Sequence, residues 1–193
     1  YDLRDTGSDI YTDLELLDYI NRACRLLFSA LLSIHSDWVY ASDTSTTLSS
    51  GDSTVTAPTD CASIRSLWVS TDQKTEKPLD WIIYKLTLNG TSTGEPEYYA
   101  LSGANIQFEI IADDDYSLTI YYNKLHTTLA TGGTMPFGGA FDDSVVKAVV
   151  LMAKNRNELE TSTDAAVYNL FTSAGMTNAI SRIHARKPYR LDF

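Results

Sequence analysis

The sequence of 193 residues has few of the residues that usually carry chemistry. It contains two cysteines and three histidines. His35, His126 and His184 lie on three separate predicted elements and lack the HExxH spacing of a zinc helix. We therefore expect no metal and no cofactor. Cys24 and Cys61 are expected to be buried free thiols of a reducing compartment, and a disulfide between them is the alternative.

Long apolar runs are also missing. No segment approaches the roughly 18 consecutive apolar residues that a membrane-spanning helix needs. No basic and apolar leader precedes the first predicted helix. The sequence therefore predicts a protein that works without a membrane.

Basic residues are scarce. The chain has 15 lysines and arginines and 25 aspartates and glutamates, which gives a net charge of -10. This balance disfavours a nucleic-acid-binding protein, whose affinity comes from neutralising phosphates. The charge is uneven: residues 1–144 hold 8 basic and 21 acidic groups, whereas residues 145–193 hold 7 basic and 4 acidic groups. An acidic body with a mildly basic end suggests a partner that is met by the C-terminus.

A long amphipathic helix is predicted from Tyr11 to Trp38. Thr12 and Glu15 have the spacing of a capping box, in which each side chain satisfies a backbone N–H group that the other leaves open. Apolar residues then recur at steps of three and four and share one face: Leu14, Leu17, Ile20, Cys24, Leu27, Leu31 and Ile34. A second apolar row lies beside the first: Leu16, Tyr19, Ala23, Leu26 and Ala30. Either the rest of the chain wraps this helix or a second subunit covers it.

Between residues 41 and 139 the period changes from that of helices to that of strands. Alternating segments separated by short turns predict antiparallel strands, which we place at 63–70, 97–101, 106–111 and 118–125. The segment from Leu79 to Leu88 is ambiguous, because its aromatic and β-branched residues favour a strand while its length allows a short helix. Asn89-Gly90 is interpreted as a turn rather than as a glycosylation acceptor.

Helical periodicity returns after the glycine-rich segment 126–141. Asp142 and Asp143 supply an acidic first turn, and a later helix ends before Pro188. The order of helix, strands and helices predicts the α+β class. We expect an α-helical body formed by residues 1–40 and 140–193, with an antiparallel β-rich insertion at residues 41–139.

Catalytic patterns are weak throughout the chain. The segment GGTMPFGG has the glycines of a phosphate loop without its lysine, and no G-x-S-x-G elbow occurs. Asp113-Asp114-Asp115 lacks the spacing of a calcium loop and is interpreted as a solvated turn. We therefore expect that the protein is not an enzyme. The alternative is a two-carboxylate glycosidase, for which the candidate residues are Glu15, Glu97 and Glu109.

Aromatic residues concentrate in the predicted strands, and two interpretations of them stay open. They form either the packing of the sheet or a surface that binds a sugar or a protein. The residues concerned are Trp68, Trp81, Tyr84, Tyr98, Tyr99, Tyr121 and Tyr122.

The C-terminus combines cations with apolar anchors. This segment is either a solvated end or a docking arm that orders on a partner. The arm residues are Arg182, Arg186, Lys187, Tyr189, Arg190, Leu191 and Phe193.

A series of short motifs makes the chain resemble a known family. In order they are Ile20-Asn21-Arg22-Ala23 and Asp37-Trp38 of the opening helix, Leu48 to Asp60, Ser63 to Val69, Lys77-Pro78-Leu79, Gly94-Glu95-Pro96-Glu97-Tyr98-Tyr99-Ala100, Leu118 to Tyr122, and Phe141-Asp142-Asp143. This order resembles the head-to-tail adaptor (connector, head-completion) proteins of tailed phages, especially those of short-tailed phages.

The resemblance implies a structural virion protein at the head–tail junction, assembled in the host cytoplasm. Such proteins form a homo-oligomeric ring, usually of twelve copies, between the portal protein and a tail or nozzle protein with its fibres. Double-stranded DNA passes through the ring without specific binding. The C-terminal arm would dock into the portal, and the opening helix would pack between copies through Leu17, Ile20, Cys24, Leu27 and Leu31.

Two other functions stay open at this point. The first is a binding module whose β-rich part holds a tail fibre or a carbohydrate. The second is a cell-wall glycosidase that uses the carboxylates named above.

Overall fold

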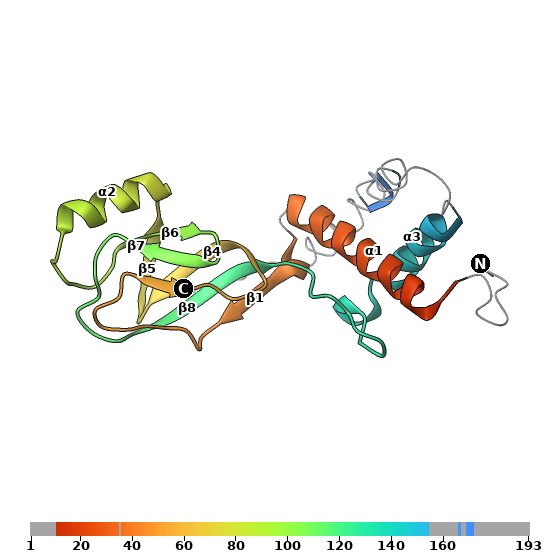
Figure 1. Ribbon diagram of the computed structural model, residues 1–193, viewed down its shortest axis with the longest axis horizontal. Helices are drawn as coiled ribbons and strands as arrows, with labels where there is room; N and C mark the ends of the chain where they lie inside the picture. Colours follow the sequence, from red (N-terminus) through yellow and green to blue (C-terminus); the bar gives the residue numbers. More distant parts are fainter. Residues whose placement is uncertain (1–10, 35, 155–165, 167–168, 172–193) are drawn as a thin grey trace, which may run out of the picture. The chain divides into compact units, whose positions relative to one another are not determined.

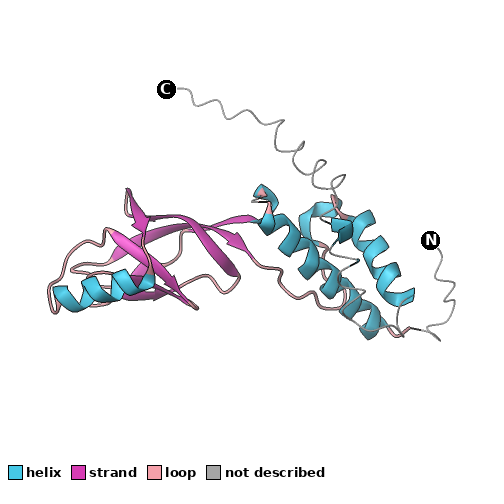
Figure 2. Ribbon diagram, turned by 90° about the horizontal axis from the view of Figure 1, so that it is seen from above, coloured by secondary structure: helices cyan, strands magenta, loops and turns pink. Residues whose placement is uncertain are grey.

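The structure, a computed structural model, describes residues 11–34, 36–154, 166 and 169–171. The chain divides into two compact units, which are drawn in Figures 1 and 2. The helical unit comprises residues 1–39 and 125–193, and the sheet unit comprises residues 40–124. Each unit has a buried hydrophobic core of its own.

Strands fill the middle of the chain with one helix between them, and one helix lies on each side of this region in the sequence. The helices are α1 (Asp13–Ser33), α2 (Leu79–Asn89) and α3 (Asp142–Lys154), with short 3-10 turns η1 (Asp37–Val39) and η2 (Pro136–Gly139). The strands are β1 (Tyr40–Asp43), β2 (Thr47–Leu48), β3 (Thr54–Thr56), β4 (Cys61–Val69), β5 (Asp72–Glu76), β6 (Tyr98–Ser102), β7 (Asn105–Phe108) and β8 (Tyr116–Lys124).

Helix α1 begins as the sequence predicts. The Thr12 hydroxyl accepts a hydrogen bond from the Glu15 N–H at 3.2 Å, and the Glu15 carboxylate accepts one from the Thr12 N–H at 2.9 Å. The capping box is therefore confirmed. The α-helix stops at Ser33, and Trp38 lies in the separate turn η1. The Ser36 N–H donates to the Leu31 carbonyl at 3.0 Å, which closes the helix end before the chain turns.

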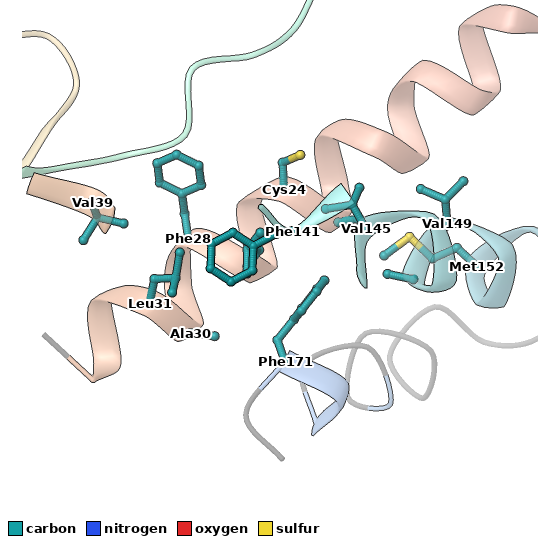
Figure 3. Close-up of a cluster of buried hydrophobic side chains, with 13 residues drawn as sticks. Cys24, Phe28, Ala30, Leu31, Val39, Phe141, Val145, Val149, Met152 and Phe171 are labelled. Carbon is teal, nitrogen blue, oxygen red and sulfur yellow. The ribbon is translucent and has the colours of Figure 1, made fainter. Parts of the chain in front are cut away.

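Helix α1 packs along α3 in the helical unit (Figure 1). Both apolar rows of α1 contribute to the core, together with side chains of α3 and of the segment after β8. Figure 3 shows these side chains converging from the two helices: Cys24, Phe28, Ala30, Leu31, Phe141, Val145, Val149 and Met152, with Val39 and Phe171 beside them.

The strands of the sheet unit, drawn in magenta in Figure 2, form one strongly curled sheet. Their order is β1-β8-β4-β5-β6-β7-β3, and β2 also pairs with β8. Strands β5 and β6 are parallel, while the other neighbours pair antiparallel. Helix α2 connects β5 to β6 and packs on β6 and β7. The connection is a βαβ crossover, because parallel neighbours cannot be joined by a tight turn.

The predicted fold class is wrong. The protein is not an α-helical body that carries an antiparallel insertion. It is a mixed α/β structure whose sheet curls into a half-barrel and contains a parallel pair. The parallel pair was not predicted because the segment 79–88 was left open between strand and helix. Its Trp-Ile-Ile-Tyr run has high β propensity but folds as α2, which allows β5 and β6 to run parallel. Burial along this element recurs in pairs with a helical period, because positions 81–82 and 85–86 are buried or half-buried while positions 83–84 and 87–88 are exposed.

Candidate functional site

The five residues predicted to pack between copies lie on α1, and three of them are sealed in the core of the helical unit. Cys24, Leu27 and Leu31 have no exposed surface, while Leu17 and Ile20 are half-buried. The chain itself therefore covers most of this row. Burial raises the pKa of the Cys24 thiol to about 11, with Asp142 adding to the shift. A role of these five residues in contacts between copies stays a prediction.

The predicted docking arm lies outside the described residues. All seven of its members fall in the segment 172–193: Arg182, Arg186, Lys187, Tyr189, Arg190, Leu191 and Phe193. The prediction of a docking arm therefore rests on the sequence alone.

A buried amide anchors the segment after β8 to α1. Asn21 is 5% exposed, and its side chain donates to the Leu129 carbonyl at 3.1 Å and accepts from the Leu129 N–H at 2.7 Å. The same amide oxygen accepts from His126 Nε2 at 3.1 Å. Sequence reasoning gave Asn21 no structural role, although a polar residue inside an apolar helix face is a signal for such an anchor.

An aromatic cluster surrounds the entry to α3. Phe137 packs on Phe28 with ring centroids 4.8 Å apart and meets Phe141 edge to face at 5.4 Å. Trp38 lies edge to face with both Phe137 and Phe141. Phe137 has a φ of 66°, which is a strained value for a residue with a side chain. The aromatic contacts hold the backbone in this conformation.

In the sheet unit, buried charged groups serve the structure. The Glu109 carboxylate, 7% exposed, accepts from the backbone N–H groups of Glu97 at 2.8 Å and Tyr98 at 3.1 Å. Lys74 is buried on β5 and forms an ion pair with Glu95 at 2.6 Å. These two anchors fix the Gly94 to Ala100 motif at the start of β6.

Two of the three carboxylates considered for glycosidase chemistry are engaged in structural hydrogen bonds, and the third, Glu97, is next to Glu109, which accepts a hydrogen bond from its backbone N–H. Glu15 caps α1 in the helical unit, whereas Glu109 binds backbone N–H groups in the sheet unit. Cys61 and Tyr99 have pKa values raised to about 11 and about 12, with burial as the largest cause in each. These groups stay protonated at neutral pH, so neither is poised as a base or a nucleophile.

The acidic turn Asp113-Asp114-Asp115 is bound to the turn that precedes β3. The Ser50 N–H donates to the Asp115 carboxylate at 2.8 Å, and the Tyr116 hydroxyl donates to Asp113 at 2.6 Å. Within the described residues, no group of three His, Cys, Asp or Glu side chains is placed to hold a metal ion. Both cysteines are free thiols as predicted, but only Cys24 is buried, while Cys61 is half-buried. In the same part of the chain, no helix is long and apolar enough to cross a membrane.

Where β5 separates from β4 to reach β6, the sheet opens into a polar groove of about 410 Å³. The groove contains both charge signs, and its lining residues are Arg65, Ser66, Gln73, Lys74, Thr75, Glu76 and Tyr99.

Most of the aromatic residues are part of the sheet packing. Tyr99 and Tyr122 belong to the core, Tyr121 stacks on Tyr40 at 5.8 Å, and Trp81 meets Tyr98 edge to face at 5.0 Å. Tyr84 differs from them, because its side chain is 60% exposed on α2.

The outer face of α2 is the largest apolar feature that the sheet unit leaves uncovered. Ile83, Tyr84 and Leu88 are 49%, 60% and 60% exposed, and Ile82 on the opposite side of the helix is fully buried. Lys85 and Lys77 lie over the ring of Trp81, at 5.5 Å and 5.8 Å from its centroid. An exposed apolar face of this kind marks an interaction surface.

The described residues thus offer an exposed apolar helix face and a polar groove as candidate sites. In the comparison with known families, the profile described as SU10 adaptor protein matches residues 2–190. The chain therefore belongs to the SU10 adaptor family, and the resemblance to phage adaptors is confirmed. It is a virion-associated adaptor protein, and the family description names no reaction. No curated protein matches the chain.

Proposed function

We propose that this adaptor forms a ring between the portal and the tail of the virion, where it passes DNA and provides the platform for tail attachment. The observation that carries the proposal is the family match over residues 2–190. The ring is homo-oligomeric, with twelve copies expected, and its tail-side partner is a nozzle protein with fibres attached.

The charge of the chain supports a conduit. The net charge is -10, and residues 40–124 alone hold 12 acidic and 5 basic side chains. A wall of the same sign as DNA makes few phosphate contacts and does not hold the duplex as it passes. The duplex therefore needs no specific site in this protein.

The C-terminal arm supports attachment to the portal. Four cations lie between Arg182 and Arg190, and Tyr189, Leu191 and Phe193 supply apolar anchors. A segment of this composition binds by ordering on a partner, where the aromatic anchors supply the buried area. In the proposal, each copy of the ring inserts one arm into the portal.

The test is co-purification of the adaptor with portal protein. A stop codon at Lys187 removes residues 187–193 and leaves every described residue in place. We expect this variant to keep the circular dichroism spectrum of the full chain and to lose portal binding. A matched control carries Val146→Ala, because Val146 is exposed on α3 and stands outside the arm. Portal binding by the truncated variant at the level of the control would refute the docking role.

The ring itself is tested by imaging. Negative-stain electron microscopy of the full chain with portal protein is expected to show a second ring stacked on the portal. Mass measurement of the same sample gives the number of copies. A stoichiometric complex with single adaptor copies in place of a ring would overturn the proposal.

A further inference from the structure

The outer face of α2 has an apolar centre with two cations at one edge and the exposed Asp80 one turn before Tyr84. Tyr84 and Leu88 are one helical turn apart and therefore share a surface, which Ile83 extends. Lys85 lies beside this surface over the Trp81 ring at 5.5 Å. Lys77 approaches the same ring, so both cations are held at the edge of the face. Such a face fits an apolar group that is surrounded by acidic side chains.

The first turns of α1 present a surface of that complementary kind. Leu14 is 76% exposed, the largest exposed fraction among the large apolar side chains that the structure describes. Asp13 and Asp18 are exposed beside it, one residue before and one turn after. The N-terminal half of α1 therefore offers one apolar side chain between two carboxylates.

We propose that the α2 face of one copy receives the Leu14 knob of a second copy of this chain. The knob is Leu14 with Asp13 and Asp18, and the α2 face is Ile83, Tyr84 and Leu88 with Lys77 and Lys85 at its edge. The inference rests on the proposed ring and names a contact within it. Opposite charges meet at the rim while the leucine and the tyrosine exclude water at the centre.

The contact is heterologous, because each copy uses one surface to give and a different surface to receive. Contacts of this kind generate a closed ring when the rotation between copies closes. The α2 face is small compared with the roughly 800 Å² per partner of a stable pair. A ring compensates for this, since every copy is then held at two surfaces.

Cross-linking of single cysteines tests the contact. The double variant Leu14→Cys/Leu88→Cys, in a Cys61→Ser background, places one thiol in the knob and one in the receiving face. Cys24 stays in place because it is fully buried. A short bismaleimide is added to the full-length protein assembled with portal, and products are separated on a denaturing gel. We expect a ladder of covalent multimers, and covalent dimers only when the two single variants are mixed.

The matched control is Val146→Cys/Leu88→Cys, because Val146 is 54% exposed and lies in the same unit as Leu14 but on α3. This control is expected to stay monomeric on the gel. Equal ladders from both pairs, or rings without any ladder from the Leu14 pair, would overturn the α2 contact and leave the proposed ring standing. Wild-type protein that stays as single copies beside portal would overturn both.

Charge reversal provides a second measurement that does not depend on cross-linking. Asp18→Lys and Lys85→Glu are each expected to lower the fraction of assembled protein by about threefold to fivefold, the size of a surface charge contact. The combined variant is expected to recover, because the pair is restored with its signs exchanged. Circular dichroism checks that each variant is folded. A combined variant that assembles no better than the two single ones contradicts the pairing.

Discussion

The attachment of the segment after β8 to α1 depends on one side chain, so Asn21→Ala is a sharp perturbation. The substitution leaves the Leu129 N–H and carbonyl without the partners that they have at 2.7 Å and 3.1 Å. A buried backbone group without a partner costs about 1 to 3 kcal/mol. Since two groups are affected and water reaches part of the site, we expect the free energy of unfolding to fall by about 2 to 4 kcal/mol.

The assay is urea denaturation followed by the fluorescence of Trp38. The sequence contains three tryptophans, so a Trp68→Phe/Trp81→Phe background leaves Trp38 as the single tryptophan reporter of the helical unit. Ser29→Ala is the matched control on the same helix. The Ser29 hydroxyl is exposed and donates to the Arg25 carbonyl one turn earlier, so its loss is expected to cost less than about 0.5 kcal/mol.

If Asn21→Ala lowered the free energy of unfolding by no more than Ser29→Ala does, Asn21 would not anchor the segment after β8. A change in the urea dependence itself, rather than in the midpoint, would show that the compactness of one of the two states had changed. The loss is therefore read from the midpoint at constant slope.

Three further predictions concern groups in both units. Burial and the Arg25 charge lower the pKa of His126 in the folded protein, so the unfolded chain binds the proton first and stability falls as the pH drops below about 6.5. The stability lost between pH 7.5 and pH 5.5, measured by urea denaturation, is expected to be smaller in His126→Gln. Glu109→Gln places an amide group against backbone N–H donors. We expect the free energy of unfolding to fall by about 1 to 3 kcal/mol, seen as a lower melting temperature in calorimetry. Leu27→Ala leaves a cavity at a fully buried position, so the free energy of unfolding is expected to fall by about 2 to 5 kcal/mol in the same experiment. An unchanged free energy of unfolding would contradict the packing of α1.

Local signals in the sequence predicted local structure. The Thr12 and Glu15 spacing gave the start of α1, and Asn89-Gly90 marked the end of α2, where Gly90 has a φ of 58°. Both signals act within one turn of the chain, so no distant residue can override them easily. The apolar rows of α1 are buried for the most part, with Leu14 as an exposed exception, and periodicity did not say what would cover them.

Long-range pairing was not predictable in the same way. Whether two strands run parallel depends on the element between them, and the α2 segment was ambiguous by propensity. Asn21 and Glu109 have partners 108 and 12 residues away along the chain, and neither position has a local pattern that names its partner. The sequence named Tyr84 as a candidate surface residue but left its exposure open, because that exposure depends on the packing of Ile82 against the sheet.

The parallel pair of β5 and β6 has a mechanical consequence. Along the strand order from β1 to β3 it is the shortest junction, with two registered residue pairs, whereas β4 and β8 share seven. A sheet pulled at its two ends yields first where the fewest hydrogen bonds share the force. The Lys74–Glu95 ion pair spans this seam and can hold its edges while the strands shear. The sheet would thus have a compliant joint between two stiffer halves.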